Sequence, residues 1–207
     1  MDFLCWCCLS PAWDDADDDT SLSRKLTVVG DGACGKTSLL LRISRDVFDD
    51  DSYDPTAYEK DVVDVFAGNR KIEMVLQDCA GQETFDRLRP VVYAETDVIL
   101  ICFSLDNPDS LFNVENSWIQ EVQFYCPDVP IILVGNKKDL RDSGPNGLTS
   151  TGQKFVTSQE GKDVAKRIQA KGYFECSAKD GENCKKLLGA SVRYSTMHRP
   201  FNSESAR

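Results

Sequence analysis

A phosphate-binding pattern occupies residues 30–37, which read GDGACGKT. Two glycines that enclose four residues, followed by lysine and threonine, form the Walker A pattern, whose backbone N–H groups surround a phosphate at a helix N-terminus. We predict that Lys36 contacts the β- and γ-phosphates and that the Thr37 hydroxyl binds Mg²⁺. A chance glycine loop is the alternative. The strand-like run before the motif and the helical spacing after it disfavour that alternative.

A second pattern, DCAGQ at residues 78–82, follows an apolar run. The Asp78 carboxylate can hold Mg²⁺, usually through water, and the Gly81 N–H can sense a γ-phosphate. Gln82 is placed to orient an attacking water, so the predicted catalytic residues are Gln82, Lys36 and Gly81. An isolated Asp-x-x-Gly would equally suit a turn. Behind a Walker A loop, it favours hydrolysis of a nucleoside triphosphate.

The sequence NKKD at residues 136–139 predicts which base is bound. The Asp139 carboxylate can accept hydrogen bonds from both the ring N–H and the exocyclic amine of guanine. Adenine offers no such pair of donors, and an unpaired buried carboxylate is costly. We expect Asn136 to brace the neighbouring loops and the Lys137 stem to cover the base. Taken alone, the same four residues would also fit a solvated polar turn.

The sequence CSAK at residues 176–179 follows the last short apolar segment. Its Ala178 N–H can donate to guanine O6. Four motifs in this order favour a guanine nucleotide over a set of unrelated turns. An ATP-using P-loop enzyme is a weaker alternative, because Asp139 does not suit adenine.

The segments between the motifs predict an α/β fold. Residues 97–103 and 130–134 are near-continuous apolar runs, typical of parallel strands covered on both faces. Strands that alternate with helices indicate a doubly wound sheet with its ligand loops at the C-terminal edge. The other expected strands are 25–29, 58–66, 71–77 and 173–176, and the expected helices are 36–45, 109–125, 158–171 and 182–194.

Composition and charge exclude several functions. The 207 residues carry a net charge of −10. This argues against nucleic acid as a ligand, which would favour a basic face, and against charge-driven docking on anionic lipid. Residues 1–20 contain six aspartates and neither lysine nor arginine. We interpret residues 1–23 as a flexible acidic extension that contains cysteine.

Cysteine usage predicts a reducing, cytoplasmic compartment. The nine cysteines are odd in number, and several lie within apolar runs, as buried reduced cysteines do. Neither a signal peptide nor an apolar run of about 18–20 residues is present. Asp2 excludes N-myristoylation, and Glu204, four residues from the end, excludes prenylation.

One lipid-related pattern remains near the start, where Cys5, Cys7 and Cys8 lie beside phenylalanine, tryptophan and leucine. S-acylation of these thiols would give a peripheral contact with the cytoplasmic face of a membrane. Free thiols at a frayed terminus are the alternative. A metal site is less favoured, because the sole histidine, His198, lies near the other end of the chain.

Together, these motifs resemble those of the small GTPases, and within them the Rho family. The resemblance covers about residues 24–194 and includes Tyr53, Thr56 and residues 86–90. It implies a P-loop NTPase G domain, with a six-stranded, mostly parallel sheet, one antiparallel edge strand and helices on both faces. The implied domain spans 24–195, with a Rho-type insert at about 142–160 that makes a poor helix, and a short tail at 196–207.

The resemblance also implies a function. The chain would be a GTP-binding switch that hydrolyses GTP to GDP and signals to effectors, in Rho-type cytoskeletal or polarity signalling. Switch I would contain Tyr53 and Thr56, with Thr56 completing the Mg²⁺ shell, and switch II would span about 80–93. Hydrolysis would be slow alone and stimulated by an activating protein, by analogy about 10³–10⁵-fold.

The implied partners are GTP and GDP, GTPase-activating and exchange proteins, and effectors that contact the two switches. Nucleic acid is not expected, and the protein is expected to be a monomer. A non-cycling, GTP-loaded scaffold is the alternative function. Its motivation is the acidic switch I, with Asp49, Asp50, Asp51 and Asp54, together with the missing prenylation signal.

The predicted nucleotide-binding residues come from the motifs and from the resemblance, which adds Phe48 as a packing partner of guanine. They are Asp31, Gly32, Ala33, Cys34, Gly35, Lys36, Thr37, Ser38, Phe48, Tyr53, Thr56, Gly81, Asn136, Lys137, Asp139, Ser177, Ala178 and Lys179. The predicted metal ligands are Thr37, Thr56 and, through water, Asp78.

Cys34 has two interpretations. It lies near Lys36 and a helix N-terminus, an environment that lowers a thiol pKa and would suit a redox sensor. The favoured interpretation is a small buried residue that the nucleotide shields.

Overall fold

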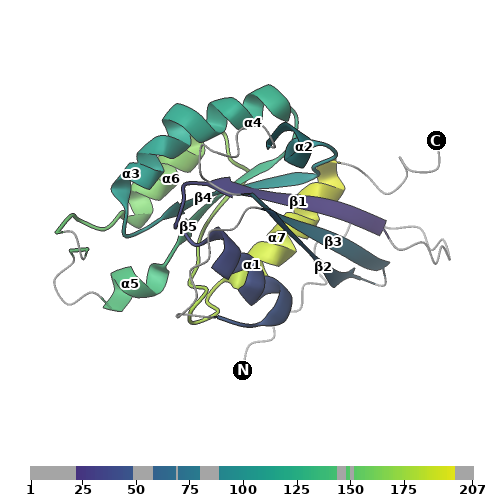
Figure 1. Cartoon of the computed structure of the whole chain (residues 1–207), viewed down its shortest axis with the longest axis horizontal. Coiled ribbons are helices and arrows are strands. Elements are labelled where there is room, and N and C mark those ends of the chain that lie inside the picture. Colours follow the sequence, from purple (N-terminus) through teal and green to yellow (C-terminus); the bar gives the residue numbers. More distant parts are fainter. Residues whose placement is uncertain are drawn as a thin grey trace.

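The computed structural model describes residues 22–48, 58–68, 70–79, 89–143, 148–149 and 152–198. These residues form three layers, with a six-stranded sheet between two layers of helices (Figure 1). The strand order is β2-β3-β1-β4-β5-β6. Every neighbouring pair is parallel except β2 and β3, so the edge strand β2 is antiparallel. The predicted α/β class and sheet are therefore confirmed.

The elements alternate along the chain. The strands are β1 (Leu22–Gly30), β2 (Tyr58–Ala67), β3 (Arg70–Cys79), β4 (Val98–Ser104), β5 (Ile131–Asn136) and β6 (Gly172–Glu175). The α-helices are α1 (Lys36–Arg45), α2 (Arg89–Tyr93), α3 (Pro108–Asn113), α4 (Ile119–Tyr125), α5 (Lys138–Ser143), α6 (Ser158–Arg167) and α7 (Cys184–His198). A π-helical segment, η3 (Val114–Trp118), joins α3 to α4.

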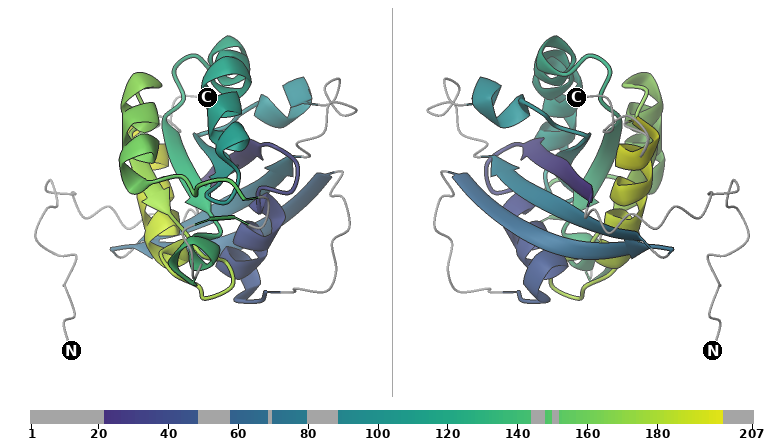
Figure 2. Two further views of the ribbon diagram at one scale, coloured as in Figure 1. Left: turned by 90° about the vertical axis from the view of Figure 1, so that its left-hand side faces the viewer. Right: turned by 90° about the vertical axis from the view of Figure 1, so that its right-hand side faces the viewer.

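The sheet separates two hydrophobic cores, and β4 contributes to both. Its side chains alternate in direction, so Ile101 and Phe103 lie in the core beneath α3, α4 and α6. Leu100 and Cys102 lie in the core beneath α1 and α7. Figure 2 shows the helices on the two faces. Burial on both faces explains why β4 is apolar along nearly its whole length.

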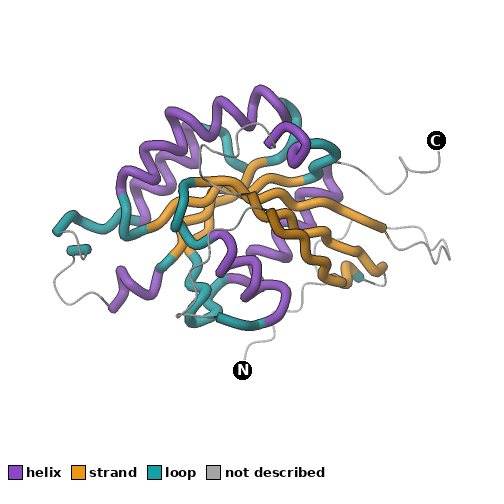
Figure 3. The backbone as a smooth tube through the Cα atoms, in the orientation of Figure 1, coloured by secondary structure: helices purple, strands orange, loops and turns teal. Residues whose placement is uncertain are grey.

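The segment predicted as one helix over residues 109–125 has a more complex structure. It follows one continuous path from α3 through η3 to α4 (Figure 3). In the middle, the Ile119 N–H donates to the Val114 carbonyl, five residues earlier. The longer spacing is characteristic of a π-turn, which inserts one residue into an α-helix and is frequent at functional sites.

Several boundaries differ from the prediction. β1 begins at Leu22, three residues before the expected start, and α7 extends to His198. The helices α2 and α5 were not predicted, since five or six residues are too few for helical periodicity to be recognised. In the described part of the insert, Leu148 and Lys154 form an isolated antiparallel bridge.

None of the helices in the described ranges has both the length and the hydrophobicity that crossing a membrane requires.

Candidate active site

The sequence motifs meet at one edge of the sheet. Strands β1, β3, β5 and β6 run parallel in one sheet, so their C-terminal ends face the same way. Residues 30–37 cover the end of β1, the loop and the start of α1, while Asp78 lies near the end of β3. The other two motifs lie at the ends of β5 and β6. This edge is where parallel α/β sheets bind ligands.

The phosphate loop connects β1 to α1 in a conformation that its glycines allow. Gly30 has φ 141°, and a Cβ at that position would lie 2.1 Å from the Cys102 carbonyl oxygen. Gly35, the residue before α1, has φ 89° in the left-handed region. The buried Lys36 Nζ donates to the carbonyls of Gly30 at 2.8 Å and Asp31 at 2.6 Å. The ammonium group is thereby held within its own loop.

Two predicted metal ligands contact each other. The Thr37 Oγ1, in the first turn of α1, donates to the Asp78 Oδ2 at 2.6 Å. A hydroxyl and a carboxylate are the hard oxygen donors that Mg²⁺ prefers, so this pair fits the ion. Thr56, the third predicted ligand, lies outside the described residues.

The environment of Cys34 is the reverse of what a redox sensor needs. The side chain is 1% exposed, and its Sγ donates to the Cys102 carbonyl at 3.5 Å. Burial raises the pKa of the thiol, and the nearby Lys36 offsets this only in part. The expected lowering of the pKa was therefore wrong, because burial outweighs the lysine. The structure supports the small buried residue.

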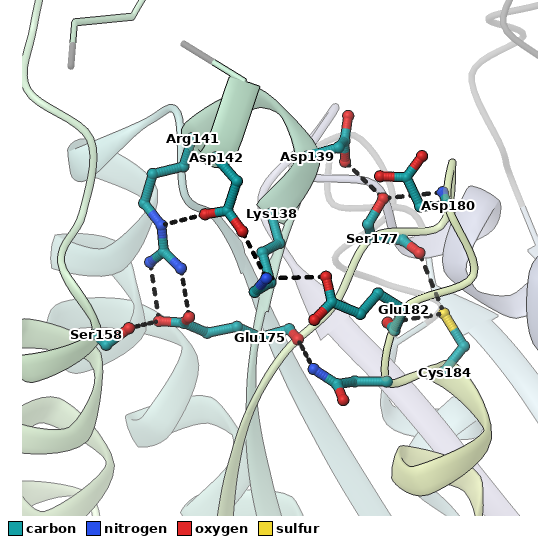
Figure 4. Close-up of polar contacts among 11 residues, drawn as sticks. Lys138, Asp139, Arg141, Asp142, Ser158, Glu175, Ser177, Asp180, Glu182 and Cys184 are labelled. Atoms are coloured by element: carbon teal, nitrogen blue, oxygen red, sulfur yellow. Dashed lines mark hydrogen bonds and ion pairs between the residues drawn. The ribbon is translucent and has the colours of Figure 1, made fainter. Parts of the chain in front are cut away.

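The NKKD motif contacts both the phosphate loop and the CSAK motif. The buried Asn136 Nδ2 donates to the Cys34 carbonyl at 3.0 Å. The Asp139 Oδ1 accepts from the Ser177 Oγ at 2.8 Å, as Figure 4 shows. Lys137 has φ 60°, and its Nζ lies 3.6 Å from the Asp106 carboxylate. The phosphate-side and base-side motifs thus form one connected group.

Arg42 is a site-supporting residue that the sequence analysis missed. It lies on α1, and its Nε donates to the Ala178 carbonyl at 2.6 Å. Its Nη2 donates to the Lys179 carbonyl at 2.9 Å. The helix that begins in the phosphate loop therefore holds the backbone of the CSAK loop. The sequence offered no signal beyond the position of Arg42 on the predicted helix.

A bidentate ion pair also lies beside the two base-side loops, residues 136–139 and 176–179, and joins α5 to the last residue of β6 (Figure 4). Arg141, at 18% side-chain exposure, donates from Nη1 and Nη2 to the two carboxylate oxygens of Glu175, at 11%, over 3.0 and 2.5 Å. The Ser158 and Tyr173 hydroxyls also donate to Glu175 Oε1, at 2.8 and 2.7 Å. These hydrogen bonds outweigh burial and lower the pKa of Glu175 to about 2. The pKa of Arg141 is raised by the same pairing.

A second ion pair runs beside the first. The Lys138 Nζ lies 2.5 Å from Asp142 on α5 and 2.8 Å from Glu182, which follows the CSAK loop (Figure 4). Both carboxylates raise the pKa of Lys138. The loops after β5 and β6 are therefore linked by two charged pairs and by the contact between Asp139 and Ser177.

The remaining predicted site residues are exposed, half-buried or outside the described part of the chain. Gly32 and Ala33 are exposed at the tip of the phosphate loop, and a Cβ at Gly32 would meet nothing within 4 Å. Ser38 and Phe48 are half-buried. The predicted residues that lie outside the described part of the chain are Tyr53, Thr56, Gly81 and Gln82.

The fold and the grouped motifs define a P-loop nucleotide-binding protein. The family model described as "Ras family" matches residues 25–196, and the chain belongs to that family. More narrowly, over 189 residues the chain is 49% identical to the "GTP-binding protein RHO1" of Saccharomyces cerevisiae, covering 90% of each protein. The chain is a Rho-family small GTPase, a switch that hydrolyses GTP to GDP. This identity does not favour the alternative of a non-cycling scaffold.

Proposed function

We propose that the sheet edge formed by residues 30–37, Asp78, residues 136–139 and residues 176–179 is the site where this switch binds and hydrolyses GTP. One observation carries the proposal. A phosphate loop, a pair of oxygen ligands and a guanine-type carboxylate are linked by hydrogen bonds at the same edge. Such a site has a phosphate end and a base end that are held at a fixed separation.

At the phosphate end, the N–H groups of residues 31–37 and the N-terminus of α1 would surround the β- and γ-phosphates. Lys36 has three N–H donors. Two hold the loop carbonyls, and the third faces the Cys34 sulfur at 3.9 Å, a weak acceptor that a phosphate oxygen can replace. Lys36 therefore needs little rearrangement to contact phosphate.

Mg²⁺ would be held by the Thr37 hydroxyl, by Asp78 through water and, when GTP is bound, by Thr56. When bound, the ion would supply positive charge that neutralises the phosphates. Thr37 and Asp78 share one hydrogen bond, so their oxygen atoms lie close enough together for both side chains to hold the same ion.

At the base end, the Asp139 carboxylate would accept hydrogen bonds from the ring N–H and the amine of guanine. The Ser177 hydroxyl would keep its hydrogen bond to Asp139 Oδ1. The Ala178 N–H would donate to O6, and the Lys137 stem and Phe48 would cover the base. Asn136, which is bonded to the phosphate loop, would transmit the position of one end to the other. Selectivity for guanine follows, because adenine leaves the carboxylate unpaired.

For hydrolysis, Gln82 would orient the attacking water and the Gly81 N–H would sense the γ-phosphate. An activating protein would supply an arginine, since none of the matched motifs places an arginine at the phosphate loop. The open space around Gly32 suits such an approach. Exchange proteins and effectors would contact switch I and switch II, the second at about 80–93.

The test combines nucleotide analysis with turnover. Nucleotide extracted from the purified protein is identified by chromatography, and GTP turnover with Mg²⁺ is measured with and without a Rho-type activating protein. We expect bound guanine nucleotide, slow turnover and strong stimulation. Lys36→Ala and Asp139→Ala should each lose nucleotide. Asp128→Ala, an exposed aspartate before β5 at the opposite edge, should not. Tight ATP binding that survives Asp139→Ala would refute the assignment of the base end.

We further propose that residues 24–195 form the G domain with its insert at about 142–160, between an extension at 1–23 and a tail at 196–207. The protein would act as a cytoplasmic monomer. S-acylation of Cys5, Cys7 or Cys8, which lie outside the described residues, would bring it to the cytoplasmic face of a membrane. Hydroxylamine-sensitive acyl labelling should disappear in a Cys5/Cys7/Cys8→Ser variant. Absence of labelling in the native protein would refute this part.

A further inference from the structure

The side chain of Asp31, in the phosphate loop, contacts the helical segment formed by α3 and η3. Its Oδ1 accepts from the Trp118 indole Nε1 at 2.6 Å, and its Oδ2 accepts from the Asn113 Nδ2 at 2.7 Å. Each carboxylate oxygen therefore has its own donor from the α3–η3 segment. Hydrogen bonds to an ionised acceptor are shorter and stronger than neutral ones. Trp118 is 6% exposed, so the indole itself is largely withdrawn from water.

An ordinary α-helix would not present these two donors together. Asn113 and Trp118 are five residues apart, and at 3.6 residues per turn such positions point about 140° away from each other. The π-turn between them is wider, with the Ile119 N–H bonded to the Val114 carbonyl. The extra residue in the turn rotates Trp118 back toward the direction of Asn113. The π-turn is therefore the local structure that lets one carboxylate accept from both side chains.

Asp31 also takes part in holding the lysine of the phosphate loop. Its carbonyl accepts from the Lys36 Nζ at 2.6 Å, while its carboxylate accepts from Asn113 and Trp118. One residue thus links the ammonium group that would contact phosphate to a helix anchored in the core. The two neutral donors also hold the negative charge of the carboxylate against the α3–η3 segment. A free carboxylate in this loop would repel the phosphates.

We infer that Asn113, Trp118 and the Asp31 carboxylate form a clamp that fixes the phosphate loop in its nucleotide-holding conformation, with Asn113 and Trp118 as positioning residues. This inference rests on the proposed phosphate site. It predicts that loss of either donor accelerates nucleotide release without changing the hydrolysis step. It also predicts that the indole senses whether the phosphate loop is occupied.

The first test measures release of a fluorescent GDP analogue from the Mg²⁺-loaded full chain. A hydrogen bond to a charged group corresponds to about a 10- to 150-fold effect on an equilibrium constant, of which only a small part reaches the bound nucleotide. We expect release to be about three- to tenfold faster in Asn113→Ala and in Asp31→Asn. Single-turnover hydrolysis of preloaded GTP by Asn113→Ala should stay within about twofold of the native rate.

The chain offers a matched control. Asn116 lies on η3, the π-helical segment that contains Trp118, and is exposed. Its side chain donates to the Phe112 carbonyl on α3, one turn earlier, at 2.8 Å. Asn116→Ala loses the same side chain at a similar place without touching the clamp, so its release rate should equal the native rate. Adding Asn113→Ala to Asp31→Asn should accelerate release by less than the product of the single effects.

The second test uses the fluorescence of Trp118. If Trp118 only stabilised the fold, its emission would not depend on the bound nucleotide. Trp6→Phe and Trp13→Phe leave Trp118 as the sole tryptophan of the chain. Its emission should change when a chelator removes Mg²⁺ and GDP dissociates. This change should be lost in Asp31→Asn. Native release rates in Asn113→Ala, or emission that ignores the nucleotide, would overturn the clamp. Failure of the native chain itself to retain GDP would instead refute the proposed site.

Discussion

Replacing Glu175 by glutamine removes one charge from the bridge between the base-side loops and keeps the size of the side chain. Glu175 lies two residues before Ser177, and its partner Arg141 lies two residues after Asp139. Glutamine can accept only from part of the guanidinium fork, and its own N–H₂ faces the donors that the second oxygen served. The two loops then lose their strongest connection.

The magnitude follows from how far the pair is withdrawn from water. Breaking a fully buried pair by removing one partner costs about 3–5 kcal/mol, whereas exposed pairs contribute about 0–1 kcal/mol. The side chains of Arg141 and Glu175 are 18% and 11% exposed. We therefore expect Glu175→Gln to lower the free energy of unfolding by about 2–3 kcal/mol, which for a domain of this size lowers Tm by roughly 4–12 °C.

The assay is denaturation at saturating GDP, because bound nucleotide itself stabilises the fold. Glu115→Gln is the matched control, since it breaks an equally bidentate pair with Arg167 at 2.6 and 2.9 Å. That pair joins η3 to α6 and is more exposed, with the side chain of Glu115 at 30% and that of Arg167 at 58%. Its loss should cost no more than about 1 kcal/mol. GDP release should accelerate in Glu175→Gln and stay native in Glu115→Gln.

The pH dependence supplies a further check. The pKa of Glu175 is about 2 in the folded protein, below the ordinary value of 4.5. A lowered pKa means that this stabilisation is complete above about pH 5 and is lost as the pH falls toward 2. The difference between native protein and Glu175→Gln should shrink over that range. A Glu175→Gln protein no less stable than Glu115→Gln at neutral pH would refute the reasoning.

Three further predictions concern single positions. Burial and a raised pKa should keep the Cys34 thiol unreactive, so alkylation at pH 8, followed by peptide mass spectrometry, should be slow until the protein is unfolded. Gly161→Ala should lower the melting temperature, although alanine favours helices, because its Cβ would lie 2.1 Å from the Tyr173 hydroxyl oxygen; a stabilised variant would contradict this. Arg42→Met should accelerate GDP release about three- to tenfold by freeing the Ala178 carbonyl, whereas an unchanged rate would show that the loop holds without it.

Much of the fold was predictable because its central strands are buried on both faces. Runs such as β4 are recognisable as strands from their apolar composition alone, and the motif loops after β1, β3 and β5 follow such runs. The short helices α2 and α5 gave too little periodicity. The π-turn at Val114–Trp118 was equally invisible, since one inserted residue hardly alters the apolar spacing over a span of this length.

At the site, the motifs were predictable but their connections were not. Lys36 and Thr37 follow from local spacing, whereas the pairing of Arg141 with Glu175 joins residues 34 positions apart in the sequence. Charge alone does not indicate which of many acids and bases will meet. Cys34 illustrates the same limit, because its local sequence favours a low pKa and its tertiary burial raises it.

Helix α1 carries a contact with each end of the site. Its first residue, Lys36, lies at the phosphate end, and Arg42 holds the backbone at the base end. Six residues of α-helix rise about 9 Å, so the helix sets the distance between the two ends of the site. Deleting one residue between Lys36 and Arg42 would shorten this distance by about 1.5 Å and turn Arg42 by about 100°, away from its loop. The distance between the phosphate end and the base end is thus set by the number of helical residues between Lys36 and Arg42. Substitutions that keep this number and the helix should keep that distance.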